Sequence, residues 1–427
     1  MASQSAVCKT VLANGVRVLS ERVPYVDSVS VGIWTQAGAR DEDDKRLGIS
    51  HFVEHMLFKG TENRSAKQIA DEMDGLGGHL NAFTDKEFTC YYAKVLHEHL
   101  PKSLEILSDM VLNSVLDSEE IEREKNVVIE EIKRHQDTPE EQVHDVLAGL
   151  LWNGYRIGNP VIGSSAVVQS LTRDDLRAYM SEFYRPNALV ISAAGNVDHC
   201  EFVDMVAKAF GGLTGSRPPR VTNKVVAKAE IRLMDKTTEQ VHFCLGTEGF
   251  AQDQPEKYAL ATIDSVLGGG MSSRLFQEIR ENRGLAYAIG SYSSSYKEAG
   301  LFAVYGGTSI ENIKYVLELS EAECASIGRD SVTDAELERS KNQIRGALVL
   351  GQESTSNRMS RLAKSELYFG RIIRLDEIIT LITRVSKDDV ARVASKLFEK
   401  SQFALAAIGP FKKNPELTEG NLLSSHS

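Results

Sequence analysis

The sequence lacks a long apolar run and has few cysteines. No stretch of about 18 or more residues is both apolar and free of charge, which argues against a membrane-spanning helix. The five cysteines are scattered without CxxC spacing, as expected for reduced, mostly buried thiols. The first residues show neither the pattern of a secretory signal nor that of a transit peptide. We therefore expect a cytoplasmic protein without a membrane partner, although a processed form in an organelle matrix also fits.

The sequence also lacks an excess of positive charge. The chain has 49 Lys and Arg against 60 Asp and Glu, a net charge of −11. A nucleic-acid partner would require a basic face, so we expect none. An acidic chamber that attracts basic peptides would fit this balance, but solubility alone also explains it.

The chain is longer than one ordinary core, and its two halves repeat the same order of signals. Three pairs of segments align, at offsets of 210, 216 and 214: residues 48–60 with 258–270, 122–126 with 338–342, and 172–175 with 386–389. The repeat predicts two related domains. A segment rich in Gly, Ser and Pro separates them, so we expect an N-terminal domain at 1–210, a linker at 211–224 and a C-terminal domain at 225–427.

Strand and helix patterns mix within each half. Asn14-Gly15 predicts a hairpin turn between two short strands. Further strands are expected at 29–35, 189–195, 241–245 and 404–409, and helices at 66–75, 98–113, 119–136 and 173–183. We predict an α+β fold of two homologous domains, each a largely antiparallel sheet with packed helices.

The segment at 51–55 reads H-x-x-E-H. On a helix His51 and His55 lie on one face, so both imidazoles can reach one metal ion. Glu54 lies beside them, where its carboxylate can hold a water molecule. This order is the inverse of the H-E-x-x-H motif of zinc peptidases.

Two histidines leave a catalytic zinc one protein ligand short. The helical pattern over 119–135 carries Glu124 and Glu131, seven residues and two turns apart on one face, and either could complete the site. Glutamates on a helix are more often a solvated face. The second half nevertheless lacks the whole set, because the aligned positions are Ala261, Asp264, Ser265, Ser340 and Ala347. Because all the candidate metal-site residues are absent together from the second half, a metal site in the first half alone is favoured.

At these residues the chain resembles the pitrilysin (M16) metallopeptidase family, of the mitochondrial processing peptidase β-subunit type, over nearly its whole length. In that family H-x-x-E-H is followed about 75 residues later by a ligand glutamate; 75 residues lie between His55 and Glu131. The resemblance implies one Zn²⁺ per chain, bound by His51, His55 and Glu131. It also implies Glu54 as the catalytic base and Glu124 as a supporting acid behind the ligands.

Other segments extend the resemblance. Residues 77–84 are similar to an exposed strand edge beside the metal in that family, and an aromatic residue near the substrate falls at Phe58. These matches imply a substrate-binding set: Phe58, Asn81, Ala82, Phe83 and Thr84. Residues 268–276 resemble a Gly-rich loop, which by itself would equally fit a tight turn. Arg280 and Tyr287 resemble the family's catalytic Arg/Tyr pair.

The resemblance implies a zinc metalloendopeptidase that cleaves peptides or unfolded protein segments with metal-activated water. Family members of this length usually form two-chain enclosures, so we expect a homodimer in which Arg280 and Tyr287 reach the partner's zinc. A heterodimer with a separate partner chain is the alternative. The alternative function is a non-catalytic structural or substrate-binding subunit of the same fold, although such chains typically have degraded motifs.

Overall fold

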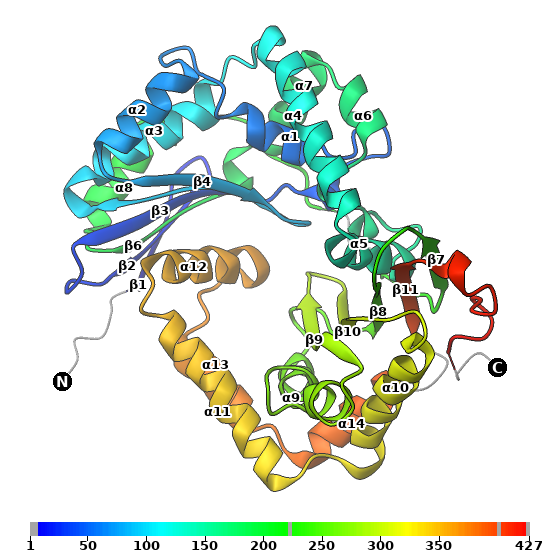
Figure 1. Cartoon of the computed structure of the whole chain (residues 1–427). Coiled ribbons are helices and arrows are strands. Elements are labelled where there is room, and N and C mark those ends of the chain that lie inside the picture. Colours follow the sequence, from blue (N-terminus) through cyan, green and yellow to red (C-terminus); the bar gives the residue numbers. More distant parts are fainter. Residues whose placement is uncertain (1–6, 221–223, 399–402, 424–427) are drawn as a thin grey trace. The chain divides into compact units, whose positions relative to one another are not determined.

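The computed structural model describes residues 7–220, 224–398 and 403–423 (Figure 1). The chain divides into two compact units, and each is discontinuous in sequence. The first unit contains residues 1–133, 159–221 and 350–373, and the second contains 134–158, 222–349 and 374–427. The domain boundaries expected from the sequence stay a prediction; residues 221–223 of the expected linker lie outside the described residues.

The first unit has a sheet of six strands in the order β1-β2-β6-β3-β5-β4. The strands are β1 (Val7–Val11), β2 (Arg17–Arg22), β3 (Ser28–Thr35), β4 (His79–Thr84), β5 (Thr89–Leu96) and β6 (Leu189–Gly195). Neighbouring strands are antiparallel except for the parallel pair β2 and β6. The hairpin predicted at Asn14-Gly15 is confirmed, with Gly15 at φ 97°. Because β4 ends the sheet, one side of its backbone pairs with β5 and the other faces away from the sheet.

Helices cover both faces of this sheet. They are α1 (Ile49–Met56), α2 (Ala66–Gly75), α3 (Leu100–Asn113), α4 (Ser118–Asp137), α6 (Ser165–Ser170), α7 (Arg173–Phe183), α8 (His199–Phe210) and α12 (Thr355–Phe369). Alternation along β3 separates two cores: Ile33 packs with Phe52 of α1, while Trp34 points the other way, against Leu362 of α12. Figure 1 shows α3 and α8 on one face and α12 on the other.

The second unit repeats this plan. Its strand order is β7-β11-β8-β10-β9, built from β7 (Ile231–Asp235), β8 (Val241–Glu248), β9 (Ala286–Ser295), β10 (Gly300–Thr308) and β11 (Ala404–Gly409). Its helices are α5 (Pro139–Leu151), α9 (Lys257–Leu267), α10 (Ile313–Asp330), α11 (Asp334–Gly351), α13 (Leu375–Thr383) and α14 (Lys387–Leu397). The order matches β2-β6-β3-β5-β4 of the first unit, with the single parallel pair in the same place. The prediction of an α+β fold with two related halves is therefore confirmed.

Each sheet receives one helix from the other half of the sequence. The helix α12 packs against β2, β3 and β6, and α5 packs against β8 and β11. The two helices begin 216 residues apart, the offset found between the repeated long helices α4 and α11. The exchange is thus part of the repeat, and it explains why neither unit is one continuous segment.

The aligned segments 172–175 and 386–389 both begin helices. The capping boxes at Thr172 and Ser386 close on Asp175 and Asp389, and begin the related helices α7 and α14. Among the described residues, no helix is both long and apolar enough to cross a membrane.

Candidate functional site

The helix α1 carries the H-x-x-E-H segment, and its start is held by a buried carboxylate. Gly48 lies before the helix at φ 90°, and a Cβ there would lie 2.8 Å from the carbonyl oxygen of Ile162. Glu42, which is 1% exposed, accepts hydrogen bonds from the backbone nitrogens of Gly48 (2.7 Å) and Ser50 (2.8 Å). Burial raises the pKa of Glu42 to about 7, against the opposing effect of these bonds. The start of α1 is therefore fixed in the interior of the unit.

One face of α1 is buried and the other carries the polar motif. Its fully buried apolar side chains are Ile49, Phe52, Val53 and Met56. Their spacing leaves His51, Glu54 and His55 on the remaining face, where each is only partly buried. The helix therefore presents all three polar side chains to one region outside the core.

The helix α4 brings two carboxylates to the same region. Its buried stripe is Ile121, Val128 and Ile132, as the sequence pattern predicts. Glu124 is almost fully buried, whereas the side chain of Glu131 remains 44% exposed. Glu124 and Glu131, either of which could complete the site by sequence, thus occupy different environments.

His51, His55 and Glu131 converge on one point. Glu131 Oε2 lies 3.8 Å from His51 Nε2 and 3.6 Å from His55 Nε2, and one ligand atom from each residue lies within 4.8 Å of the others. Tetrahedral zinc with bonds of about 2.0–2.1 Å places its ligand atoms roughly 3.3 Å apart, so only small movements separate this arrangement from zinc geometry. No other group of this kind occurs in the described part of the chain.

Glu124 lies behind His55 rather than with the converging atoms. Its Oε1 accepts a hydrogen bond from His55 Nδ1 at 2.8 Å, and its Oε2 pairs with Lys59 Nζ at 2.6 Å. Burial acts to raise the pKa of Glu124, but these two partners outweigh it and lower that pKa. Because the Nδ1 proton points at Glu124, the lone pair of His55 Nε2 is free to bind a metal. Burial acts to lower the pKa of His55, but the hydrogen bond and the charge of Glu124 outweigh burial, so that this pKa is raised.

His51 is prepared in a different way. Its Nδ1 is buried and has no hydrogen-bond partner within the described residues. Burial, with a smaller contribution from neighbouring His55, lowers the pKa of His51 to about 4. The imidazole is therefore neutral near pH 7, which is the form that binds metal ions.

Glu54 faces the edge strand β4. Thr84 Oγ1 donates a hydrogen bond of 2.6 Å to Glu54 Oε2. Burial raises the pKa of Glu54, and the bond from Thr84 opposes that rise. The sequence places Thr84 with the substrate-binding residues but does not reveal this contact.

The expected substrate residues Asn81, Ala82 and Phe83 lie on the same edge strand. Asn81 is exposed on β4, and Ala82 pairs with Tyr91 of β5. The ring of Phe83 meets Trp34 edge-on at 5.5 Å, so its side chain belongs to an aromatic cluster of the unit. Phe58 is half-buried and packs against the core beneath α1.

Arg280 and Tyr287 belong to the second unit. Arg280 lies in a π-helical turn (Phe276–Glu281), and its guanidinium carbon lies 5.0 Å from the ring centre of Tyr287 and 4.7 Å from that of Phe276. Tyr287 is the second residue of the edge strand β9 and is 78% exposed. Both residues line a polar cavity of about 510 Å³ with Gln240 and Asn312. The structure thus brings this pair together, in a different unit from the histidines.

Sequence reasoning missed Glu42, Lys59 and the contact made by Thr84. None of the three falls inside the H-x-x-E-H pattern, and each acts on it from outside α1. Lys59 lies four residues after His55, the spacing at which helical residues share a face, and this was the one local signal for its role.

Comparisons with known proteins identify the family of the chain. The family model described as "Insulinase (Peptidase family M16)" matches residues 17–165, and that described as "Peptidase M16 inactive domain" matches residues 170–344. The chain is 43% identical over 402 residues to the uncharacterized zinc protease YmxG of Bacillus subtilis, covering 94% of this chain and 98% of that protein. It is 40% identical over 407 residues to the uncharacterized zinc protease Rv2782c of Mycobacterium tuberculosis, covering 94% and 93%.

Solved structures show the same fold. A peptidase M16 inactive domain from Pseudomonas fluorescens superposes with a TM-score of 0.89 at 20% identity, covering 95% of this chain and 98% of that one. A protease from Helicobacter pylori gives 0.88 at 22% identity, covering 96% and 100%. The two family models, which match most of the sequence, and the relatives at 40–43% identity assign the chain: it belongs to peptidase family M16, the insulinase family.

Proposed function

We propose that this chain is a zinc-dependent endopeptidase in which His51, His55 and Glu131 bind one zinc ion and Glu54 is the catalytic base. The observation that carries the proposal is the convergence of the three ligand atoms within 4.8 Å, beside a carboxylate that is not among them. The relatives named zinc proteases, at 40–43% identity, support the choice of metal.

The donor set suits zinc. Two neutral imidazoles and one carboxylate are the protein ligands of many catalytic zinc sites. The neutral form of His51 and the Nδ1–H of His55 both leave a nitrogen lone pair available. Zinc would supply a Lewis acid and would lower the pKa of a water molecule to about 7.

Glu54 would carry the proton during cleavage. Its carboxylate takes a proton from the attacking water and delivers it to the nitrogen of the leaving amine. Thr84 holds Oε2 of this carboxylate and leaves Oε1 for the water. The raised pKa of Glu54 makes its carboxylate a stronger base toward the water.

Substrate would bind as an additional strand along β4. Main-chain groups of Asn81–Thr84 would pair with an extended peptide, so recognition depends on backbone shape more than on sequence. This mode suits peptides and unfolded segments. Arg280 and Tyr287, supplied by the partner in a homodimer, would stabilise the oxyanion of the tetrahedral intermediate. A heterodimer stays the alternative to the homodimer, and a cytoplasmic location stays a prediction of the sequence.

The ligand set is tested by replacing each acid of α4 in turn. Glu131→Gln should lose zinc, because two histidines hold it poorly. Glu124→Gln should keep a zinc ion that binds more weakly. Zinc content of the dialysed proteins separates the two. Normal zinc content in Glu131→Gln would refute Glu131 as the third ligand.

A further inference from the structure

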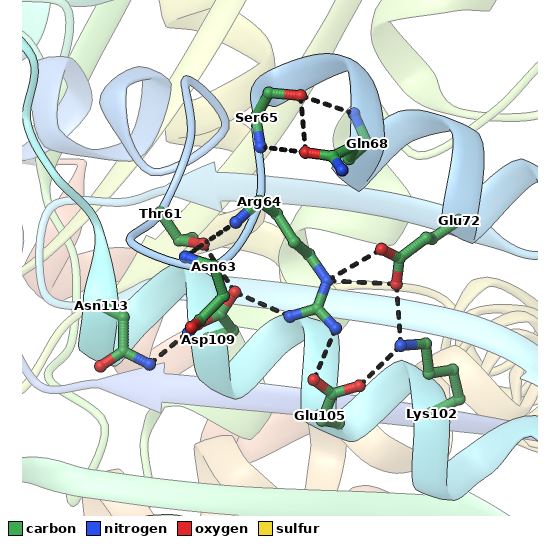
Figure 2. A network of polar contacts seen from close by, with 10 residues as sticks. All are labelled: Thr61, Asn63, Arg64, Ser65, Gln68, Glu72, Lys102, Glu105, Asp109 and Asn113. Carbon is green, nitrogen blue, oxygen red and sulfur yellow. Dashed lines mark hydrogen bonds and ion pairs between the residues drawn. The ribbon is translucent and has the colours of Figure 1, made fainter.

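A cluster of polar residues lies beyond the C-terminal end of α1 (Figure 2). At its centre is Asp109 of α3, whose side chain is 5% exposed. Its carboxylate accepts four hydrogen bonds: from Thr61 Oγ1 (2.6 Å), Asn63 Nδ2 (2.6 Å), Arg64 Nη1 (2.8 Å) and Asn113 Nδ2 (2.8 Å). We call these five residues the Asp109 clamp. Such a buried charge is stable only when its acceptor sites are filled, as they are here.

Arg64 extends the clamp to neighbouring helices. Its guanidinium pairs with Glu105 of α3 at 2.5 Å and with Glu72 of α2 at 3.1 Å, in addition to Asp109. Figure 2 shows these carboxylates spread around its planar fork, and Lys102 bridging Glu72 and Glu105. Lysine could not reproduce this pattern, because its ammonium is a single point charge.

The clamp joins the segment that leaves α1 to the segment that enters α4. The backbone nitrogen of Glu62 donates to Asn113 O at 2.9 Å, and that of Val115 donates to Gly60 O at 3.3 Å. Thr61 forms a β-bridge with Ser114. The helix α1 ends at Met56 and α4 begins at Ser118, so both chain segments are tied together within a few residues of the helices.

We propose that Asp109 and Arg64 are positioning residues for the metal site, which set the separation of α1 and α4 and so that of the two histidines from Glu131. This inference rests on the proposed zinc site. Glu131 lies about 20 Å along α4 from its start, so a tilt of about 3° there would move it by about 1 Å. Zinc tolerates deviations of only about 0.2 Å in its bonds, so such a movement would weaken binding.

The second half of the chain offers a matched control. Arg274 aligns with Arg64 and pairs with Glu336 of α11 at 2.8 Å, and also donates to Ser326 of α10 at 2.9 Å. Arg274 thus joins α10 and α11, and the ligand positions of the second half hold no histidine. Loss of this pair should affect folding stability alone.

The test compares Asp109→Asn, Thr61→Val and Glu336→Gln in the full chain. Asn is nearly isosteric with Asp, but its amide nitrogen can donate hydrogen bonds and cannot accept them. That nitrogen would therefore face donors of the clamp without bonding to them. For each variant we would measure the zinc dissociation constant by competition with a chelator, the melting temperature, and the visible spectrum of the cobalt-substituted protein. We expect Asp109→Asn to raise the zinc dissociation constant about tenfold or more and to change the cobalt spectrum. Thr61→Val should do the same to a smaller extent, and Glu336→Gln should lower only the melting temperature.

The inference would be overturned if Asp109→Asn kept the zinc affinity and the cobalt spectrum of wild type while its melting temperature fell as in Glu336→Gln. If Asp109→Asn does not fold, the comparison of Thr61→Val with Glu336→Gln decides by the same criterion. A wild-type chain that binds no zinc would instead refute the proposed function, and the wild-type control distinguishes the two failures.

Discussion

Thr84 Oγ1 donates a 2.6 Å hydrogen bond to Glu54 Oε2, and this contact links the two parts of the candidate site. Glu54 lies on α1 with the histidines, whereas Thr84 ends β4, the strand along which substrate would bind. The hydroxyl thus orients the proposed base relative to the peptide that it would act on. Positioning of this kind decides how often the base meets the water in a productive geometry.

Thr84→Val should impair the proposed base. The hydrogen bond lowers the pKa of Glu54, so its removal should raise that pKa further. Because a base with a higher pKa is protonated at higher pH, the acid limb of the pH profile of kcat/KM should shift to higher pH. We expect kcat/KM near pH 7 to fall about tenfold. The pH profile of peptide cleavage measures this shift. Thr84→Ser, which keeps the hydroxyl, is the control; an unchanged profile in Thr84→Val would disprove the role.

Glu124→Gln should weaken zinc binding without abolishing it. The carboxylate holds the Nδ1 proton of His55, and loss of its charge makes that imidazole a poorer ligand. We expect the zinc dissociation constant to rise about 10- to 100-fold. Glu122→Gln, an exposed acid on the same helix that pairs with Lys125, should leave it unchanged. Equal affinities in both variants would contradict the assignment.

Glu42 predicts a pH dependence of stability. Its pKa is raised from 4.5 to about 7 in the folded chain, so the folded state keeps a proton that the unfolded state has lost between these values. The stabilising contribution of this group is therefore full below about pH 4.5 and is lost as pH rises through about 7. Glu42→Gln removes this titration. The stability of wild type relative to Glu42→Gln should fall by up to about 3 kcal/mol across this window.

Denaturant unfolding of both proteins from pH 4.5 to 8 measures that difference. The offset between the two curves includes the backbone bonds from Gly48 and Ser50, which Gln satisfies less well. Only the change with pH reports the titration of Glu42. A constant offset over the whole range would show that its pKa is not raised.

The expected sharing of catalytic residues between partners can be tested with two inactive chains. Glu54→Gln lacks the proposed base, and Tyr287→Phe lacks the phenol that would stabilise the oxyanion. If Tyr287 acts across a homodimer, mixed dimers contain one complete site, and an equal mixture should recover about a quarter of wild-type activity. Cleavage assays after subunit exchange measure this. A mixture no more active than its components would place Tyr287 in the same chain as the site that it serves.

Local patterns predicted much of this structure. The spacing of His51 and His55 and the buried stripe of α4 depend on residues close in sequence, and the sequence predicted both. The repeat predicted two halves with one plan, and the matching order of five strands in each sheet bears this out. Helices of this kind can be predicted without any knowledge of contacts between residues far apart in the sequence.

Features that depend on distant contacts were not predictable. The exchange of α5 and α12 depends on which sheet buries each helix, and these contacts join residues far apart in the sequence. The bond between Thr84 and Glu54 joins elements that meet only after folding. Glu42 and Asp109 look like ordinary acids in the sequence, and only their burial reveals that backbone and side-chain donors surround them.

The most direct test of the account measures zinc content and peptide cleavage of the purified chain, wild type beside Glu54→Gln. The two proteins should contain equal zinc, near one ion per chain, because Glu54 is not a ligand in this account. Wild type alone should cleave an unstructured peptide, and a chelator should abolish that cleavage. Full activity in Glu54→Gln, or the absence of zinc from both proteins, would contradict the central claim.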